Sequence, residues 1–225
     1  MGERQITVKR SRSWLAALVV IGLASFAMGV QEAHAIAFDL NRDGCTGGCG
    51  TGSTVFGTVN VVQGSDAQHV NVTVTLNSSY FVGTGAGEAL EFNISGSPSI
   101  TVTNLTSGYK VGSSPASAST FGSFGYSITC EGSQSGHCGP GASHKLPGPL
   151  SFTVALVSGS NLAPTAFIAN SGGYYFASDI MGPSGKTGNV AASSLSPVPE
   201  PSSLLLLGFG LAGLGTTFRK RLFKG

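Results

Sequence analysis

Apolar and polar residues alternate through the middle of the chain. From 70 to 76 the sequence Val-Asn-Val-Thr-Val-Thr-Leu puts every apolar side chain on one face of an extended backbone, which is the pattern of a half-buried antiparallel strand. Clusters of Gly, Ser, Pro and Asn separate this stretch from others like it. The predicted strands are 55–62, 70–76, 90–94, 100–103, 121–130, 150–157, 166–169, 174–180 and 187–191.

Short strands divided by turns, with no helical period between them, predict an all-β domain. We expect an antiparallel β-sandwich or jelly-roll-like domain, flanked by an N-terminal signal helix and a C-terminal transmembrane helix. Disorder is the alternative, because Gly, Ser and Thr are abundant in this part of the chain. Regular alternation of Val, Ile, Leu and Phe favours a folded domain.

The two ends of the chain carry a different pattern, a continuous apolar run. The first run, 14–30, follows basic residues and precedes small residues at Ala33 and Ala35. A basic start, an apolar stretch and an A-x-A site form a secretory signal peptide, here 1–35. We expect signal peptidase to cut after Ala35 and to leave Ile36 as the first residue. An uncleaved anchor helix is the alternative.

The second apolar run, 202–218, contains no charged residue, follows three closely spaced prolines and ends at the basic tail 219–225. As a helix it is about 25 Å long, which is marginal but sufficient to cross a bilayer. Basic residues beyond such a run stay in the cytoplasm, and the signal peptide sends the preceding domain out. Both ends therefore predict the same topology.

The prolines and their neighbours carry a resemblance to a known family. Val-Pro-Glu-Pro-Ser at 198–202, the Leu- and Gly-rich run and the terminal basic cluster resemble the PEP-CTERM sorting signal of Gram-negative bacteria. The resemblance implies that an exosortase recognises Pro199, Glu200 and Pro201, cuts nearby and transfers the protein to a surface or extracellular acceptor. The same tail is also labelled an ice-binding protein C-terminal domain, which describes the tail and says nothing about binding ice. A permanent single-pass anchor and a GPI signal are the alternatives.

These patterns divide the chain into a signal peptide at 1–35, an exported domain at 36–197 and a sorting signal at 198–225. The sorting signal consists of the motif at 198–202, the transmembrane helix at 202–218 and the basic tail at 219–225. We expect the precursor in the inner membrane, held by this C-terminal helix, and the product at the cell surface or in the extracellular matrix of a Gram-negative bacterium.

Charge is sparse, at 10% of residues, and most basic residues lie at the two ends. Between 36 and 197 there are seven acidic and four basic residues. A domain without a basic face does not bind nucleic acid through counterion release. The low charge also argues against a coiled coil.

All four cysteines lie in the exported part, where an oxidising compartment favours disulfides. They are Cys45, Cys49, Cys130 and Cys138. Three connectivities are possible, and we expect the local one, which joins the first to the second and the third to the fourth. A zinc site with His137 and His144 is the alternative, but the spacing of the last two cysteines does not fit the usual pairs.

An acidic segment precedes the first cysteine. Asp39, Asn41 and Asp43, followed by Gly44, match the first half of a calcium-binding loop. The position that should supply the bidentate acid is Gly50, so these residues are a weak calcium candidate. The alternative is an acidic loop fixed by the adjacent disulfide, and we expect no metal.

Catalytic arrangements are poorly supported. Ser135 and His137, with Glu131 nearby, lie in a Gly- and Ser-rich loop that would hold a triad badly. Glu88 and Glu91 offer two carboxylates, but alternation places Glu91 on the outward face of a strand. We therefore expect no enzyme, no catalytic residue and no cofactor.

The expected function is a non-enzymatic surface or extracellular-matrix protein, sorted by an exosortase and associated with exopolysaccharide. Its expected partners are signal peptidase, exosortase and the polysaccharide. The alternative is an adhesin-like module that binds a glycan or a protein, and after it a permanent membrane protein. A glycan-stacking surface would have to use Tyr80, Phe81, Tyr109, Tyr126, Tyr174 and Tyr175, because the only Trp lies in the signal peptide.

Overall fold

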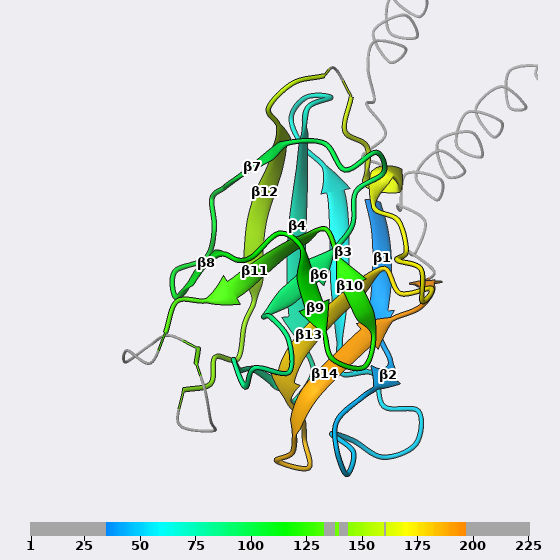
Figure 1. Ribbon diagram of the computed structural model, residues 1–225, viewed down its shortest axis with the longest axis vertical. Helices are drawn as coiled ribbons and strands as arrows, with labels where there is room; N and C mark the ends of the chain where they lie inside the picture. The colour runs from blue at the N-terminus through cyan, green and yellow to red at the C-terminus, as the bar shows by residue number, and fades with distance from the viewer. Residues whose placement is uncertain (1–34, 133–137, 140–143, 160, 197–225) are drawn as a thin grey trace, which may run out of the picture. The chain divides into compact units, whose positions relative to one another are not determined.

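The computed structural model describes residues 35–132, 138–139, 144–159 and 161–196. These residues form antiparallel sheets, with one short 3-10 turn as the helical element. The prediction of an antiparallel all-β domain is confirmed. Figure 1 shows two layers of strands, one in front of the other.

The first sheet, sheet A, has six strands in the order β15-β1-β3-β4-β12-β7. In this order the strands are Leu195–Ser196, Ala35–Leu40, Gly57–Gln63, His69–Leu76, Leu150–Leu156 and Ile100–Thr103. Strand β4 shows why the sheet forms: Val70, Val72 and Val74 are fully buried, while Asn71 and Thr75 at alternate positions are exposed. The period of two therefore sets one apolar and one polar face.

The second sheet, sheet B, has the order β2-β14-β13-β6-β11-β8, and β5 also pairs with β13. In this order the strands are Arg42–Asp43, Thr187–Ala192, Phe176–Met181, Leu90–Phe92, Tyr126–Cys130 and Tyr109–Val111, with β5 at Tyr80–Phe81. Because β5 and β6 both pair with β13, the segment 82–89 between them leaves this strand and returns to it.

One apolar core lies between the two sheets. Phe38 and Phe152 of sheet A contact Phe176 and Phe92 of sheet B, with ring centroids 4.9 and 5.9 Å apart. All four rings are buried, and burying a phenylalanine stabilises the fold by roughly 1.5–3 kcal/mol. The domain is therefore a β-sandwich whose two layers share one core.

A third layer covers the outer face of sheet B. Strands β9 (Ala116–Ala118) and β10 (Gly122–Phe124) form a hairpin that packs on this face through a second apolar cluster, which includes Ala177 of β13 and Ala191 of β14. The small side chains on the sheet leave room for Phe124 of the hairpin. As a result, every residue of β13 is buried.

Most predicted strands are present, with ends that differ by one or two residues. The prediction of a strand at 166–169 is wrong: Pro164–Ala166 form a 3-10 turn, and beyond it only a single bridge joins Phe167 to Ile94. Pro164 has no N–H for a sheet and a fixed φ suited to a turn. The range 121–130 divides into β10 and β11. The alternation does not predict β1, β2, β5, β8, β9 and β15.

The predicted signal peptide, except Ala35, and the predicted transmembrane helix at 202–218 lie outside the described residues. Within the residues that the structure describes, no helix is long and apolar enough to cross a membrane. The boundaries of the three predicted segments remain predictions.

Candidate functional site

Both local disulfides are present in the structure, Cys45–Cys49 and Cys130–Cys138, and no cysteine is free. Because each sulfur is bonded to another sulfur, none of the four can bind zinc as a thiolate. His137, one of the alternative zinc ligands, lies outside the described residues.

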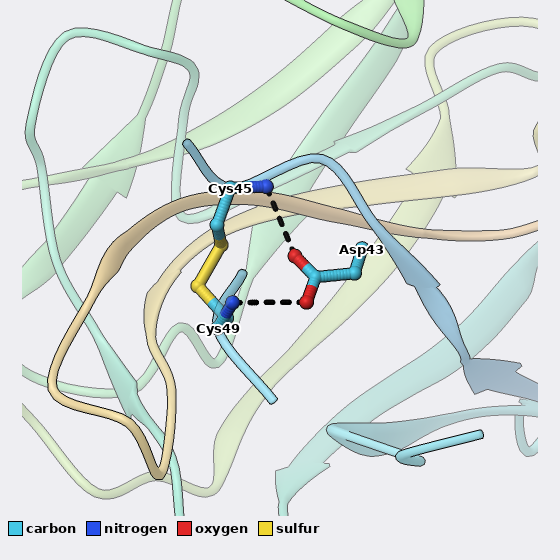
Figure 2. A group of neighbouring side chains, drawn as sticks. All are labelled: Asp43, Cys45 and Cys49. Atoms are coloured by element: carbon cyan, nitrogen blue, oxygen red, sulfur yellow. Dashed lines mark hydrogen bonds between the residues drawn. A yellow bond between two sulfur atoms is a disulfide. The ribbon is translucent and has the colours of Figure 1, made fainter. Parts of the chain in front are cut away.

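The first disulfide closes a loop around a carboxylate (Figure 2). Asp43 Oδ1 accepts a hydrogen bond from the backbone N–H of Cys45 at 3.0 Å, and its Oδ2 accepts from Cys49 at 2.9 Å and from Gly50 at 3.2 Å. Hydrogen bonds to an ionised acceptor are stronger than neutral ones. Asp43 thus holds the loop together.

The calcium candidate formed by Asp39, Asn41 and Asp43 lies on an extended segment that runs from β1 into β2. Asp39 accepts a hydrogen bond from the Thr58 hydroxyl at 3.2 Å, while both oxygens of Asp43 accept from the loop. Alternate residues of an extended chain are about 6–7 Å apart, whereas a calcium loop curls its ligands around one ion. The potential metal ligands that cluster at this place are Asp43 and the two cysteines. Because the two sulfurs are joined in a disulfide, this cluster does not suit a metal ion.

Glu91 is fully buried, and the expectation that it faces solvent is wrong. It does lie on the outer face of sheet B, but the hairpin β9–β10 and the segment 82–89 cover that face. Its Oε1 accepts from the backbone N–H of Glu88 at 3.0 Å. Burial, together with the neighbouring charges of Glu88 and Asp179, raises the pKa of Glu91 to about 7.

Asp179 of β13 is the second fully buried carboxylate. Its Oδ2 accepts two hydrogen bonds from Thr84, one from the backbone N–H at 2.7 Å and one from the hydroxyl at 2.6 Å. Burial raises the pKa of Asp179 to about 6, although the hydrogen bonds from Thr84 act in the opposite direction.

Asn189 of β14 lies directly opposite Asp179 in the sheet register. Its Nδ2 donates to the carbonyl of Ala86 at 2.7 Å. Glu91 is paired with Ala177, two residues from Asp179 on β13, so the three polar side chains share one face. We call Glu91, Asp179 and Asn189 the polar row. The alternation of apolar and polar residues along the chain does not predict the polar row. The signal that could have indicated it is an acid and an amide inside otherwise apolar strands.

A cleft of about 540 Å³ adjoins the polar row. Glu88, which is half-buried, lies in its wall together with glycines of the segment 82–89, and the Ser113 hydroxyl lies 3.5 Å from Glu88 Oε1. No cationic side chain among the described residues forms an ion pair with Glu88, Glu91 or Asp179. The cleft therefore lies beside a buried region that holds two carboxyl groups.

The aromatic residues considered for glycan stacking pack against other side chains. Phe81 and Tyr109 are buried against each other, with centroids 5.6 Å apart. Tyr126 stacks on Phe92, and its hydroxyl donates to the carbonyl of Pro98. The remaining contacts are Tyr174 on Phe121, Tyr175 on Phe38 and Lys145 over Tyr80. These residues do not gather into one platform.

The remaining site candidates lie mostly outside the described residues. These are Ser135 and His137 of the loop, Ala33 of the signal cleavage site, and Pro199, Glu200 and Pro201 of the sorting motif. Ala35 is the first residue of β1. Strand β15 pairs with β1 through Ser196 and Ala37 and through Leu195 and Phe38, so both ends of the domain lie at one side of sheet A.

Comparison with known proteins concerns the C-terminal end. No curated protein and no solved structure matches the chain significantly. The profile of the PEP-CTERM protein-sorting motif matches residues 197–221, and this match begins directly after β15. The motif implies export, processing by an exosortase and a destination in the cell envelope or at the surface of a Gram-negative bacterium. The chain is therefore a protein with a C-terminal PEP-CTERM sorting motif.

Proposed function

We propose that the chain is a non-enzymatic protein of the cell surface or extracellular matrix, delivered by an exosortase and associated with exopolysaccharide. The observation that carries the proposal is the match to the sorting motif at 197–221. The last strand ends at Ser196, so a cut within the motif removes no described strand. Cleavage of a signal peptide after Ala35 would likewise remove only one residue of β1, and that residue is exposed.

The outer face of sheet A supports association with a neutral polysaccharide. It presents hydroxyl and amide side chains from neighbouring strands, among them Asn60, Thr75, Thr101 and Thr103, which are all exposed. Some of its members already bond to each other, as the Ser151 hydroxyl does to Thr73 at 3.2 Å. Such groups both donate and accept hydrogen bonds, as sugar hydroxyls do.

A glycan-docking module that stacks sugars on aromatic rings is the second candidate. Because the aromatic side chains are used in packing, no observation favours it over the first. If the polysaccharide binds to the outer face of sheet A, its contacts with the protein are numerous, polar and individually weak. Retention of the protein would then depend on the length of polysaccharide bound.

The sorting step is tested by replacing Glu200 with Ala. Export depends on the signal peptide and should continue, while processing stops, so that the precursor keeps its tail through Gly225. Mass spectrometry of the C-terminus, in cells with an active exosortase, measures this. Wild-type protein that also ends at Gly225 would refute exosortase processing and favour a permanent anchor.

Association with polysaccharide is tested on the open face. Asn60→Glu with Thr75→Glu adds two charges there and should release the exported protein from the matrix into the medium. Ser117→Glu, on the exposed side of β9, is the matched control and should stay matrix-bound. Equal retention of both variants would contradict a role for sheet A.

A further inference from the structure

Three buried oxygens of the polar row lack a hydrogen-bond partner among the described residues. They are Glu91 Oε2, Asp179 Oδ1 and Asn189 Oδ1. The three residues are 0%, 0% and 1% exposed. Buried polar atoms in folded proteins are nearly always paired. Three such atoms on one face therefore indicate a shared partner outside the polypeptide.

When both carboxyls are ionised, all three atoms are acceptors. The other oxygens of Glu91 and Asp179 already accept from the segment 82–89. The amide of Asn189 is oriented by its bond to Ala86, because Nδ2 donates to that carbonyl and Oδ1 is left over. A partner that satisfies carboxylate and amide oxygens together has to be positively charged or a proton donor.

The segment 82–89 lies across the row. Thr84 contacts Asp179, Ala86 contacts Asn189 and the backbone of Glu88 contacts Glu91. Gly87 lets the backbone approach the amide closely, since a Cβ there would lie 2.5 Å from Asn189 Oδ1 and 2.9 Å from Nδ2. Sheet B therefore lies on one side of the polar row. The backbone of the segment 82–89 lies on the other side, with Gly87 next to the amide of Asn189.

The charge of the region is negative and uncompensated. Glu91 and Asp179 are buried, Glu88 lies in the wall of the adjoining cleft, and none of them is paired with a cation of the described chain. The three carboxylates are not all within 4.8 Å of one another. Glu88 is the one that is half-buried and lines the cleft.

We propose that the polar row binds a divalent cation, and that the cation is calcium. Glu91, Asp179 and Asn189 supply the protein oxygens, and water from the cleft side completes the shell beneath Glu88. Calcium accepts six to eight oxygen ligands in irregular arrangements, whereas magnesium demands an octahedron. The row offers neither nitrogen nor sulfur, so softer metals are disfavoured.

The raised pKa values of the two carboxyls agree with a missing counter-charge. Since protons compete with the ion, calcium affinity should increase from pH 6 to pH 8, as Glu91, with its pKa of about 7, and Asp179, with its pKa of about 6, lose their protons. Among the described residues, the other charged groups on this face include Glu88, Lys110, which is exposed on β8, and Arg42 of β2, which pairs with Ala191. The hairpin β9–β10 contributes no titratable side chain.

The test uses the exported protein, purified with both disulfides intact and stripped of metal with EDTA. Calorimetric titration at pH 8 should show one calcium per chain, with a dissociation constant of about 10⁻⁴–10⁻³ M, as in extracellular modules. At ten times that concentration the unfolding equilibrium constant should fall about tenfold. Magnesium should give a smaller effect.

Two isosteric variants locate the ion. Glu91→Gln and Asp179→Asn should each weaken calcium binding at least tenfold, and Glu88→Gln should weaken it less. Asp43→Asn is the matched control in the other acidic segment and should bind calcium as the wild type does. If Asp179→Asn does not fold, the two glutamate variants still decide the question.

The proposal is overturned by any of three results. The first is wild-type protein without heat or thermal shift on adding calcium, which would mean that water alone partners the row. The second is unchanged calcium binding in Glu91→Gln. The third is loss of binding in Asp43→Asn with binding kept in Glu91→Gln, which would place the ion at the disulfide loop. None of these results bears on sorting by the exosortase.

Discussion

At the scale of single residues, the position of a carboxylate decides which pH range stabilises the fold. Glu91 and Asp179 are buried, and the pKa of each is raised, to about 7 and about 6. Asp66, in contrast, lies on the surface, where the hydrogen bond from His69 lowers its pKa. Glu91 and Asp179 therefore bind more protons in the folded state than in the unfolded state, whereas Asp66 binds fewer.

Metal-free protein should therefore lose stability as the pH rises from about 4.5 to about 7, because the folded state must give up protons that the unfolded state has already lost. Glu91→Gln removes its share of this loss, on the order of 3 kcal/mol. Urea unfolding in EDTA at pH 5 and pH 8 measures the change. Asp66→Asn should keep the decline, and a wild type equally stable at both pH values would contradict a buried, unpaired Glu91.

At the scale of elements, alternation identifies strands and their faces but not what covers each face. In β4 the polar face is exposed, as its sequence predicts. In β6 and β13 the outer face is buried, because a hairpin from 116–124 packs on it. That contact joins segments far apart in the chain, and no local pattern contains it. The same contact explains why the sequence predicts an exposed Glu91 and gives no indication that Asp179 belongs to a buried polar row.

The hairpin itself should be stabilised chiefly by Phe124, which is 1% exposed and packs on Ala177 and Ala191. Phe124→Ala should cost about 3–5 kcal/mol, because it leaves a cavity between the hairpin and the sheet. Val111→Ala, at a site 58% exposed, should change stability by less than about 0.5 kcal/mol. Denaturant unfolding at pH 5 compares them. A small effect of Phe124→Ala would mean that the hairpin is not part of the cooperative fold.

At the scale of the whole chain, the patterns at the two ends predict a route, and the folded domain fits between them. The sorting motif could be recognised from 198–202 because its proline-glutamate-proline spacing is local. The weak calcium candidate at Asp39, Asn41 and Asp43 was local too, yet the strand pairing of β1 and β2 draws it into an extended form. Local spacing was thus reliable for a linear sequence motif and unreliable for a site that needs a folded shape.

The position of β15 leads to a last prediction. This two-residue strand pairs with β1 and so protects an edge that would otherwise be open to other chains. A stop codon after Ser196 should give an exported domain as stable as the naturally processed one. A stop codon after Ser194 removes β15, should cost about 1–2 kcal/mol and should increase self-association. Urea unfolding and sedimentation velocity compare the two. Equal behaviour, or a processed protein that ends before Leu195, would show that sorting does not depend on leaving β15 in place.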